Sequence, residues 1–356
     1  MTQLRPGDPT TAAGHNEPGP GELTSAQLEA ARLLNYYRAK IRHDLDEPRQ
    51  AKQSGSRGQW WRRIDWSDLA LRELLAAVAT GVILSGMFYV IESRREQRMI
   101  EATERLENVR FVRQLAIDAP DSVKRLAGID LRGGQLSGLD LSPADLFMAN
   151  LADANLAHSY LNEVRLTNAV LTGTNLNGAN LNDANLNDAN LTDADLARAN
   201  LTGAALVGAA FVRADLTRAH LAQAGLGKAN LTDADLTRAN LWNATMHEAN
   251  FTRANLAGAY FGNAYMHSVN LADANLANAN LTDADLTLAN FVGANLTDAD
   301  LTRANFVGAN LTGANLTGAW LNDVALDGVW WCPGSPPVWP NGFPAPRSAL
   351  PPNGEC

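Results

Sequence analysis

The residues of this 356-residue chain that are best suited to chemistry lie mostly in its second half. Four histidines lie between residues 126 and 331, and none has a partner at the spacing of a metal site or of a catalytic triad. The sequence has no glycine-rich phosphate loop and no GxSxG or HExxH motif. We therefore expect no enzymatic activity, no cofactor and no metal site. The four histidines are His158, His220, His247 and His267.

A repeat of five residues determines where these side chains can lie. Every fifth residue from Leu126 to Leu326, 41 positions in all, is Leu, Phe or Met. From Ala144 onward the residue two places before it is usually Ala, and the residue directly before it is often Asn or Asp. The first repeats are irregular, with Lys124, Ile129, Gly134 and Leu139 at the small-residue position, and are expected to form an imperfect N-terminal cap. A helix would rotate successive Leu residues off one face, and a flat strand would send them to alternate faces. Only a chain that turns a corner every five residues keeps all of them inside, with the histidines and charges outside.

The composition excludes several classes of protein. The chain has 38 acidic and 29 basic residues, a net charge of −9, which argues against a general nucleic-acid binder. Its two cysteines exclude a disulfide-dense scaffold and a cysteine-rich zinc protein. Structural and protein-binding functions remain.

The segment ANLTDADLTRANL, from Ala229 to Leu241, is nearly a copy of the pattern A(D/N)LXX. In this pattern the chain resembles the pentapeptide-repeat family. The resemblance implies an all-β solenoid, namely a right-handed quadrilateral β-helix in which four repeats make one coil. Residues 126–331 would then form about ten coils, with neighbouring coils about 4.8 Å apart. We call this expected β-helix the rod.

The same resemblance implies that residue n stacks on residue n + 20, so that outward residues form columns. One column alternates in sign from Asp193 to Asp273, and an Asp column and an Arg column run beside each other. Opposite charges on neighbouring strands contribute about 0.2–1 kcal/mol, so we predict a self-neutralised surface, with binding of a charged partner as the alternative. The candidate interaction surface consists of Asp193, Arg213, Asp233, Arg253, Asp195, Asp215, Asp235, Arg198, Arg218 and Arg238.

The composition changes several times before the repeat begins. Residues 1–23 are rich in Pro and Gly and are expected to be disordered. An amphipathic helix is predicted over 24–47, and a linker with an interfacial Trp and Arg segment over 48–68. A helix over 69–91 and a charged helical stalk over 92–125 follow. The apolar stripe of the stalk fits either ordinary packing or a parallel two-stranded coiled coil.

The segment from Leu74 to Ile91 contains 18 residues without a charge. As a helix it would be about 27 Å long, which is near the lower limit for crossing a bilayer. We predict a single-pass transmembrane helix within 69–91, with a buried soluble helix as the alternative. Ala77, Gly81 and Ser85 share one face of it in a small-xxx-small pattern, which would allow a homodimer.

The side of the membrane on which the rod would lie is less constrained. Arginines flank both ends of the apolar segment in nearly equal number, so the positive-inside rule does not decide the orientation. Translocating a charged N-terminal segment of 73 residues without a signal would be unusual. We therefore favour a cytoplasmic N-terminus and an exterior rod.

Residues 332–356 are rich in proline and are predicted to cap the last coil or to form a tail. Proline cannot donate to a further ladder, and aromatic side chains can cover the last Leu layer. Cys332 and Cys356 would form a disulfide in an oxidising compartment, or else remain two free thiols.

Two functions fit these features. The first is a non-enzymatic, membrane-anchored scaffold that presents a rigid rod to an unidentified protein partner. The second comes from the resemblance, because some members of the family imitate duplex DNA and bind a type II topoisomerase. From Leu126 to Trp331 there are 20 acidic and 9 basic residues, a net charge of −11, which is compatible with that role. The interleaved Arg columns, the uninterrupted repeat and the membrane anchor argue against it, and we expect no nucleic-acid partner.

Overall fold

The structure, a computed structural model, describes residues 69–118 and 123–347. The predictions for 1–23, 24–47 and 48–68 fall outside these residues. The chain divides into two compact units, Met1–Phe88 and Tyr89–Cys356, and each unit is described by itself.

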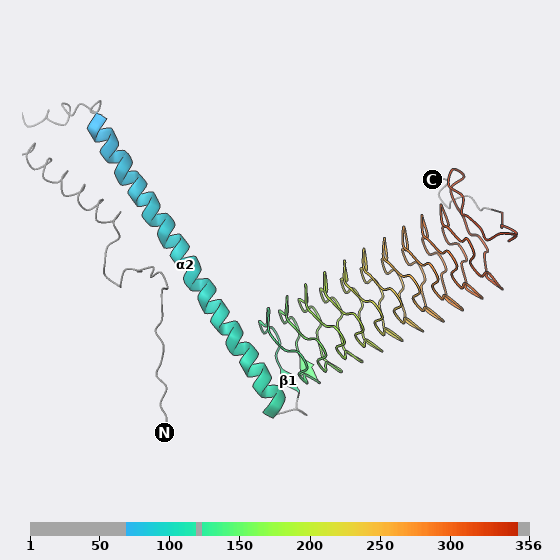
Figure 1. Cartoon of the computed structure of the whole chain (residues 1–356), viewed down its shortest axis with the longest axis horizontal. Coiled ribbons are helices and arrows are strands. Elements are labelled where there is room, and N and C mark those ends of the chain that lie inside the picture. The colour runs from blue at the N-terminus through green and yellow to red at the C-terminus, as the bar shows by residue number, and fades with distance from the viewer. Residues whose placement is uncertain (1–68, 119–122, 348–356) are drawn as a thin grey trace, which may run out of the picture. The chain divides into compact units, whose positions relative to one another are not determined.

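One helix, α2, runs from Leu69 to Asp118 and includes 50 residues (Figure 1). The sequence allows this length because it contains no proline between these bounds, whereas Pro120 lies two residues beyond the helix. A single helix therefore includes both the predicted helix over 69–91 and most of the predicted stalk that begins at residue 92. Among the described residues, no helix combines the length and the apolarity that a membrane crossing requires. The transmembrane helix predicted within 69–91 is thus not confirmed.

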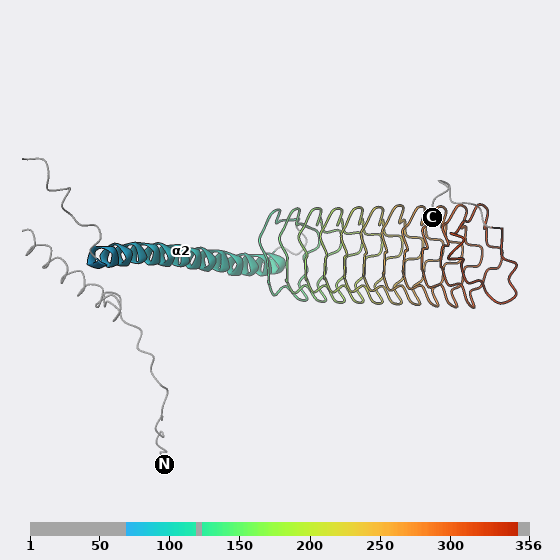
Figure 2. The same cartoon turned by 90° about the horizontal axis from the view of Figure 1, so that it is seen from above.

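The rod is a stack of coils of twenty residues each (Figures 1 and 2). Strand β1 (Lys124–Arg125) pairs in parallel with strand β2 (Ala144–Asp145), and single-residue parallel bridges continue the same register. They join Asp130 to Asn150 at the start of the rod and Asn315 to Val338 at its end. The stacking of residue n on residue n + 20 is therefore confirmed, apart from the longer step to Val338.

The inward residues of the repeat form one continuous core. Each central Leu, Phe or Met from Leu131 to Leu316 is at most 1% exposed, and the Ala residues two places before are buried with them. The rings of Phe291 and Phe306 lie 5.2 Å apart within this core. Two polar residues at the small-residue position are satisfied there, since Ser159 Oγ donates to Leu156 O and Thr174 Oγ1 donates to Leu151 O. Buried hydroxyls with such partners cost little.

The backbone turns at the second residue after each inward Leu, Phe or Met except Leu141, where Pro143 occupies that position. There the chain enters the left-handed region, in 27 non-glycine residues with φ between 53° and 61°. This conformation costs about 1–2 kcal/mol for most side chains, so the neighbouring coils must hold it. They do so through the backbone, since the N–H of the turning residue donates to the next coil, as Asp153 N does to Thr172 O at 2.9 Å. Asn or Asp before the Leu supports the same corner from the side chain, as Asn190 Oδ1 does for Thr192 N at 3.1 Å.

The first coil is covered by the part of α2 that belongs to the second unit. Val112 of this helix is fully buried, and Val109 and Ala116 pack beside it against the core. Asn108 Nδ2 donates to Asp130 O at 3.1 Å. Gly134 stands where later coils have Ala, and a Cβ there would lie 2.9 Å from Val109 Cγ2. Part of the apolar stripe on the predicted stalk thus packs on the rod.

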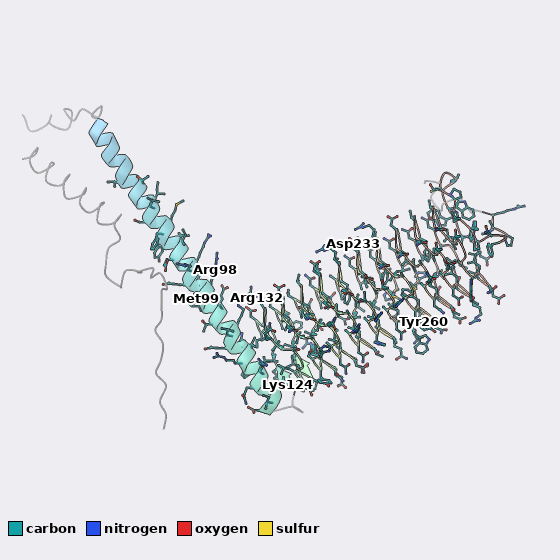
Figure 3. All side chains as sticks on the ribbon, viewed as in Figure 1. Arg98, Met99, Lys124, Arg132, Asp233 and Tyr260 are labelled. Atoms are coloured by element: carbon teal, nitrogen blue, oxygen red, sulfur yellow. The ribbon has the colours of Figure 1, made fainter. Side chains whose placement is uncertain are left out.

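Lys124 also lies two residues before an inward Leu, where later repeats have Ala. Its side chain is 1% exposed, and its Nζ donates to Ser142 O at 2.9 Å in the first coil (Figure 3). A lysine can lie buried where its ammonium group is hydrogen-bonded. The irregular repeats at the start of the rod therefore form its N-terminal end together with α2.

The far end of the rod is closed by the proline-rich segment. Val338 continues the parallel ladder, because its O accepts from Leu316 N at 2.7 Å and its N donates to Ala314 O at 2.8 Å. Trp339 packs edge-on against Trp331 and stacks on Phe343, with ring centroids 6.0 and 5.5 Å away. These rings cover apolar side chains that the last coil would otherwise expose.

We predict that Leu236→Asp destabilises the rod strongly, because the Leu236 side chain is fully buried and an unpaired carboxylate would replace it. The expected loss is at least about 3 kcal/mol in the free energy of unfolding, measured by chemical denaturation. Arg238→Ala, two residues along the same corner and exposed, is the matched control and should cost less than about 0.5 kcal/mol. Equal losses for the two variants would contradict the inward placement of Leu236.

Candidate interaction surface

The charged residues predicted to form columns do lie on successive coils. Bridges join Asp195 to Asp215 and Asp215 to Asp235. The alternating column lies at a corner, where Asp193, Arg213 and Asp233 all have φ between 58° and 60°. Because these backbones are fixed by the coil spacing, the side chains are held in register along the rod.

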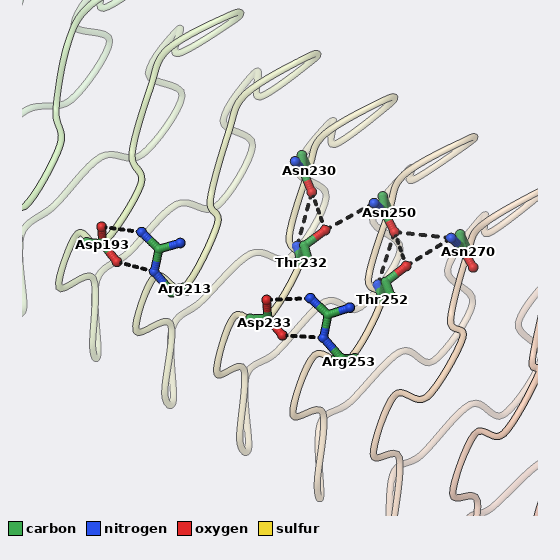
Figure 4. Close-up of polar contacts among 9 residues, drawn as sticks. All are labelled: Asp193, Arg213, Asn230, Thr232, Asp233, Asn250, Thr252, Arg253 and Asn270. Atoms are coloured by element: carbon green, nitrogen blue, oxygen red, sulfur yellow. Dashed lines mark hydrogen bonds and ion pairs between the residues drawn. The ribbon is translucent and has the colours of Figure 1, made fainter.

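The alternating column is paired in twos and is not a continuous ladder. Asp193 receives two hydrogen bonds from Arg213, at 2.7 and 2.6 Å. Asp233 receives two from Arg253, both at 2.7 Å (Figure 4). No ion pair links Arg213 to Asp233 or Arg253 to Asp273 among the described residues. Each guanidinium therefore uses its two parallel N–H groups on one carboxylate and reaches back by one coil.

These pairs shift the titration of the carboxyl groups. The hydrogen bonds from Arg213 hold the pKa of Asp193 below its ordinary value of 3.8, and those from Arg253 do the same to the pKa of Asp233. A third pair of this geometry, Asp283 with Arg303, lowers the pKa of Asp283 in the same way. All three carboxylates are exposed enough for salt to weaken the pairs.

The sequence predictions omitted several pairs that the coil register brings together. Asp283 and Arg303 are one, and Arg165 lies 3.4 Å from Asp145 by the same twenty-residue step. Lys228 and Glu248 approach to 3.7 Å. Opposite charges twenty residues apart in the sequence are the signal for all three pairs.

The second predicted set behaves differently, because Arg198, Arg218 and Arg238 make no ion pair among the described residues. They are exposed and line an open groove of about 560 Å³ together with Thr217 and Thr237. The Asp residues three places earlier are half-buried, and each supports its own corner. The Oδ1 atoms of these carboxylates accept from backbone N–H groups at 2.8–2.9 Å in Ala197, Thr217 and Thr237.

A second polar network runs beside the alternating column, because Thr232 and Thr252 directly precede Asp233 and Arg253 in the chain. Asn250 Nδ2 donates to Thr232 Oγ1 at 3.0 Å, and Asn270 Nδ2 donates to Thr252 Oγ1 at 2.9 Å (Figure 4). Asn270 Nδ2 also donates to Asn250 Oδ1 at 3.3 Å. This ladder links three successive coils through side chains and adds to the backbone bonds that fix their spacing.

The other predicted sites have simpler surroundings. His158 lies against Gly178 of the next coil, and His247 lies against Gly227 of the previous coil. No group of three or more metal-ligating side chains comes together within the described part of the chain. Outward aromatic residues such as Tyr260 project from the coils (Figure 3).

The predicted dimerisation face and disulfide remain predictions. Gly81 and Ser85 are exposed on α2, and nothing lies within 4 Å of a Cβ placed at Gly81. The side chain of Ala77 is outside the described set. Cys332 is disulfide-bonded, whereas Cys356 lies beyond the described residues, so the pairing of the two stays a prediction.

The match to one protein family agrees with this geometry. The chain matches the family described as Pentapeptide repeats (8 copies) over 149–188, 179–218, 214–253, 249–287 and 289–328, together half of its length. The chain belongs to the pentapeptide-repeat family. Pentapeptide-repeat proteins form right-handed quadrilateral β-helices and are generally non-enzymatic structural or interaction proteins.

Several solved pentapeptide-repeat structures are similar to this one. HetL of the cyanobacterium Nostoc sp. strain PCC 7120, involved in heterocyst differentiation regulation, is 31% identical, with 61% of this chain and 94% of HetL covered and a TM-score of 0.42. QnrB1, a plasmid-mediated fluoroquinolone resistance protein, is 21% identical over 46% of this chain and 90% of its own, with a TM-score of 0.37. A protein of the Arabidopsis thaliana thylakoid lumen is 32% identical over 27% and 68%, with a TM-score of 0.27. No curated protein matches the chain.

We predict that the Asp–Arg pairs make the stability of the rod depend on pH. The folded-state pKa of Asp193, Asp233 and Asp283 is lowered, so their stabilisation is present above 3.8 and is lost as the pH falls through the lowered values. The triple variant Asp193→Asn, Asp233→Asn and Asp283→Asn should melt below the unaltered protein at neutral pH. This difference should vanish in acid, as measured by thermal denaturation across pH.

The matched control for this prediction is Asp153→Asn. Asp153 occupies the same column as Asp193 and Asp233 and the same left-handed conformation, but Gly173 takes the place of an arginine in the next coil. Asn tolerates this conformation, as Asn243 does. The control should melt like the unaltered protein at every pH. A triple-variant difference that stayed constant from neutral to acidic pH would contradict a role for these ion pairs.

Proposed function

We propose that this protein is a non-enzymatic scaffold that presents the rod to protein partners. The observation that carries the proposal is the fixed register of the charged columns. Every fifth residue from Asp130 to Asn310 is bridged to the residue twenty places later, and corner residues such as Arg213 donate a backbone hydrogen bond to the next coil as well. A partner with matching charges would meet a preorganised row of side chains, so little conformational entropy would be lost on binding.

We propose further that α2 holds this scaffold at a membrane. The uncharged stretch from Leu74 to Ile91 supports this location, as do the exposed apolar side chains within it. Ile83, Leu84 and Phe88 are 58%, 64% and 67% exposed. A run of exposed apolar side chains on a helix is stabilised when lipid or protein covers it. Arg94 and Arg95 follow three and four residues after Ile91 and suit the headgroup region.

Cell fractionation tests the membrane proposal. The full-length protein should stay in the membrane pellet after carbonate and high-salt washes. The double variant Leu84→Arg and Phe88→Arg should release it to the soluble fraction. The matched control changes two exposed apolar residues of the same helix outside the segment, Met99 and Leu106, to Arg and should remain in the pellet.

Two outcomes of the fractionation decide the location. A soluble full-length protein would contradict the membrane proposal without affecting the scaffold proposal. If the protein is membrane-bound, protease added to intact cells should remove a C-terminal epitope tag, because we favour an exterior rod. An intact tag would place the rod in the cytoplasm.

A type II topoisomerase is the second candidate partner, and the net charge of −11 from Leu126 to Trp331 favours it. The bidentate pairs at Asp193 and Asp233 weigh against it, because they neutralise carboxylates that a DNA mimic would present. We therefore expect the purified protein to leave DNA supercoiling by a type II topoisomerase unchanged. Strong inhibition, lost when the acidic residues of the rod are neutralised, would favour the topoisomerase instead.

A further inference from the structure

The basic residues of the rod divide into two groups by their partners. Nine lie between Leu126 and Trp331, all of them described, and six lie within 4.0 Å of a carboxylate. The remaining three are Arg198, Arg218 and Arg238, on consecutive coils of one column. The paired residues are Arg132, Arg165, Arg213, Lys228, Arg253 and Arg303.

The same three coils carry the column of Asp195, Asp215 and Asp235. Their Oδ1 atoms accept from the corners, and the Oδ2 atoms of Asp215 and Asp235 make no hydrogen bond among the described residues. Both columns end together. Asn175 and Asn255 bound the Asp column on the coils before and after, and Gly178 and Gly258 bound the Arg column. We call the six charged residues of the two columns the Asp–Arg stripe; they are Asp195, Asp215, Asp235, Arg198, Arg218 and Arg238.

The Asp–Arg stripe is unfavourable for an isolated rod. Like charges on neighbouring strands repel, and three arginines in a row adopt the left-handed conformation, with φ of 58–60°. Elsewhere in the rod, an arginine in this conformation has a carboxylate twenty residues before it, as Arg213, Arg253 and Arg303 do. The missing counter-charge is therefore expected from outside the molecule.

We propose that the Asp–Arg stripe binds the same stripe of a second copy of this chain. If two parallel rods face each other about a twofold axis that runs along them, the Asp column of one copy lies opposite the Arg column of the other. Arg198 then meets the second copy's Asp195 on the same coil, and the next two coils repeat the contact. Twofold symmetry doubles each contact, so six ion pairs form. A twofold axis perpendicular to the rods would set like charges opposite each other and is excluded.

The coil spacing favours a second copy over an unrelated acidic protein. Two copies share one repeat of about 4.8 Å, so all three coils match at once without strain. An extended acidic peptide presents side chains on one face about 6.6 Å apart and would fall out of step with the arginines. The neutral residues at both ends of the stripe also limit the contact to the three coils that both columns share.

The contact is small and therefore weak. It involves one corner of each rod over three coils, well below the roughly 1,200 Å² of a stable interface, and its exposed ion pairs are screened by salt. Cross-linking suits such a contact. Thr217 lies on the central coil between the two columns, so it would face its own counterpart in the second copy.

We expect full-length Thr217→Cys to form a covalent dimer on mild oxidation, measured by non-reducing electrophoresis. Disulfides require Cα atoms about 4.4–6.8 Å apart, which only opposed corners provide. Val207→Cys is the matched control, because Val207 is 42% exposed and lies ten residues, half a coil, from Thr217. It should form no dimer. The native Cys332 is already disulfide-bonded.

Two charge variants in the Thr217→Cys background complete the test. Replacing the three arginines by Glu should lower the dimer yield about tenfold or more, and so should replacing the three aspartates by Asn, which retains the corner hydrogen bonds as Asn175 does. High salt should also lower the dimer yield, because it screens the ion pairs. Unchanged melting temperatures would show that both variants remain folded. Loss of the dimer in the arginine variant alone, equal cross-linking through Val207→Cys, or no dimer at all would overturn the proposal.

Discussion

The parallel backbone ladder between residue n and residue n + 20 is the constraint on which this structure depends. Leu131 N donates to Asn150 O at 2.7 Å, Gly133 N donates to Ala152 O at 2.9 Å, and the same bonds recur in nearly every repeat. The ladder sets the coil spacing, and the spacing holds the corners in a conformation that most residues disfavour. It also decides which charges meet. An arginine can reach a carboxylate one coil away, so the sequence distance of twenty residues becomes a contact.

Much of the rod could be predicted from the sequence because its signal is repeated. One Leu every five residues with a small residue two places before it leaves only a chain that turns a corner every five residues, and the family resemblance supplies the four repeats per coil. The pairing within the columns was harder. Asp193, Arg213 and Asp233 alternate at equal spacing, so sequence alone does not tell which Asp each Arg contacts. The backbone at the corner directs the Arg213 side chain toward the coil before it, and that direction is a property of the fold.

The ends of the rod were less predictable for a related reason. An apolar stripe with Val109, Val112 and Leu115 on a helix has the same pattern whether it packs against a second helix or against a coil. The structure places Val112 against the first coil, and Gly134 makes room for the approach of Val109. The aromatic and proline residues of the C-terminal segment indicated a cap, but the bridge from Asn315 to Val338 spans more than twenty residues. No repeat remained there to indicate which residue would continue the ladder.

Closure of both ends restricts how such a protein can use its surface. A solenoid with an open end presents unpaired N–H and C=O groups and an apolar axis, and it grows by end-to-end pairing. Here the helix segment containing Val112 covers one end, and the rings of Trp331 and Trp339, with Phe343 stacked on Trp339, cover the other. The corners and faces along the rod are then the surfaces left for specific contact. Six of the nine basic residues of the rod are paired with a carboxylate, so the coils that carry the three unpaired arginines are the ones best able to bind another molecule.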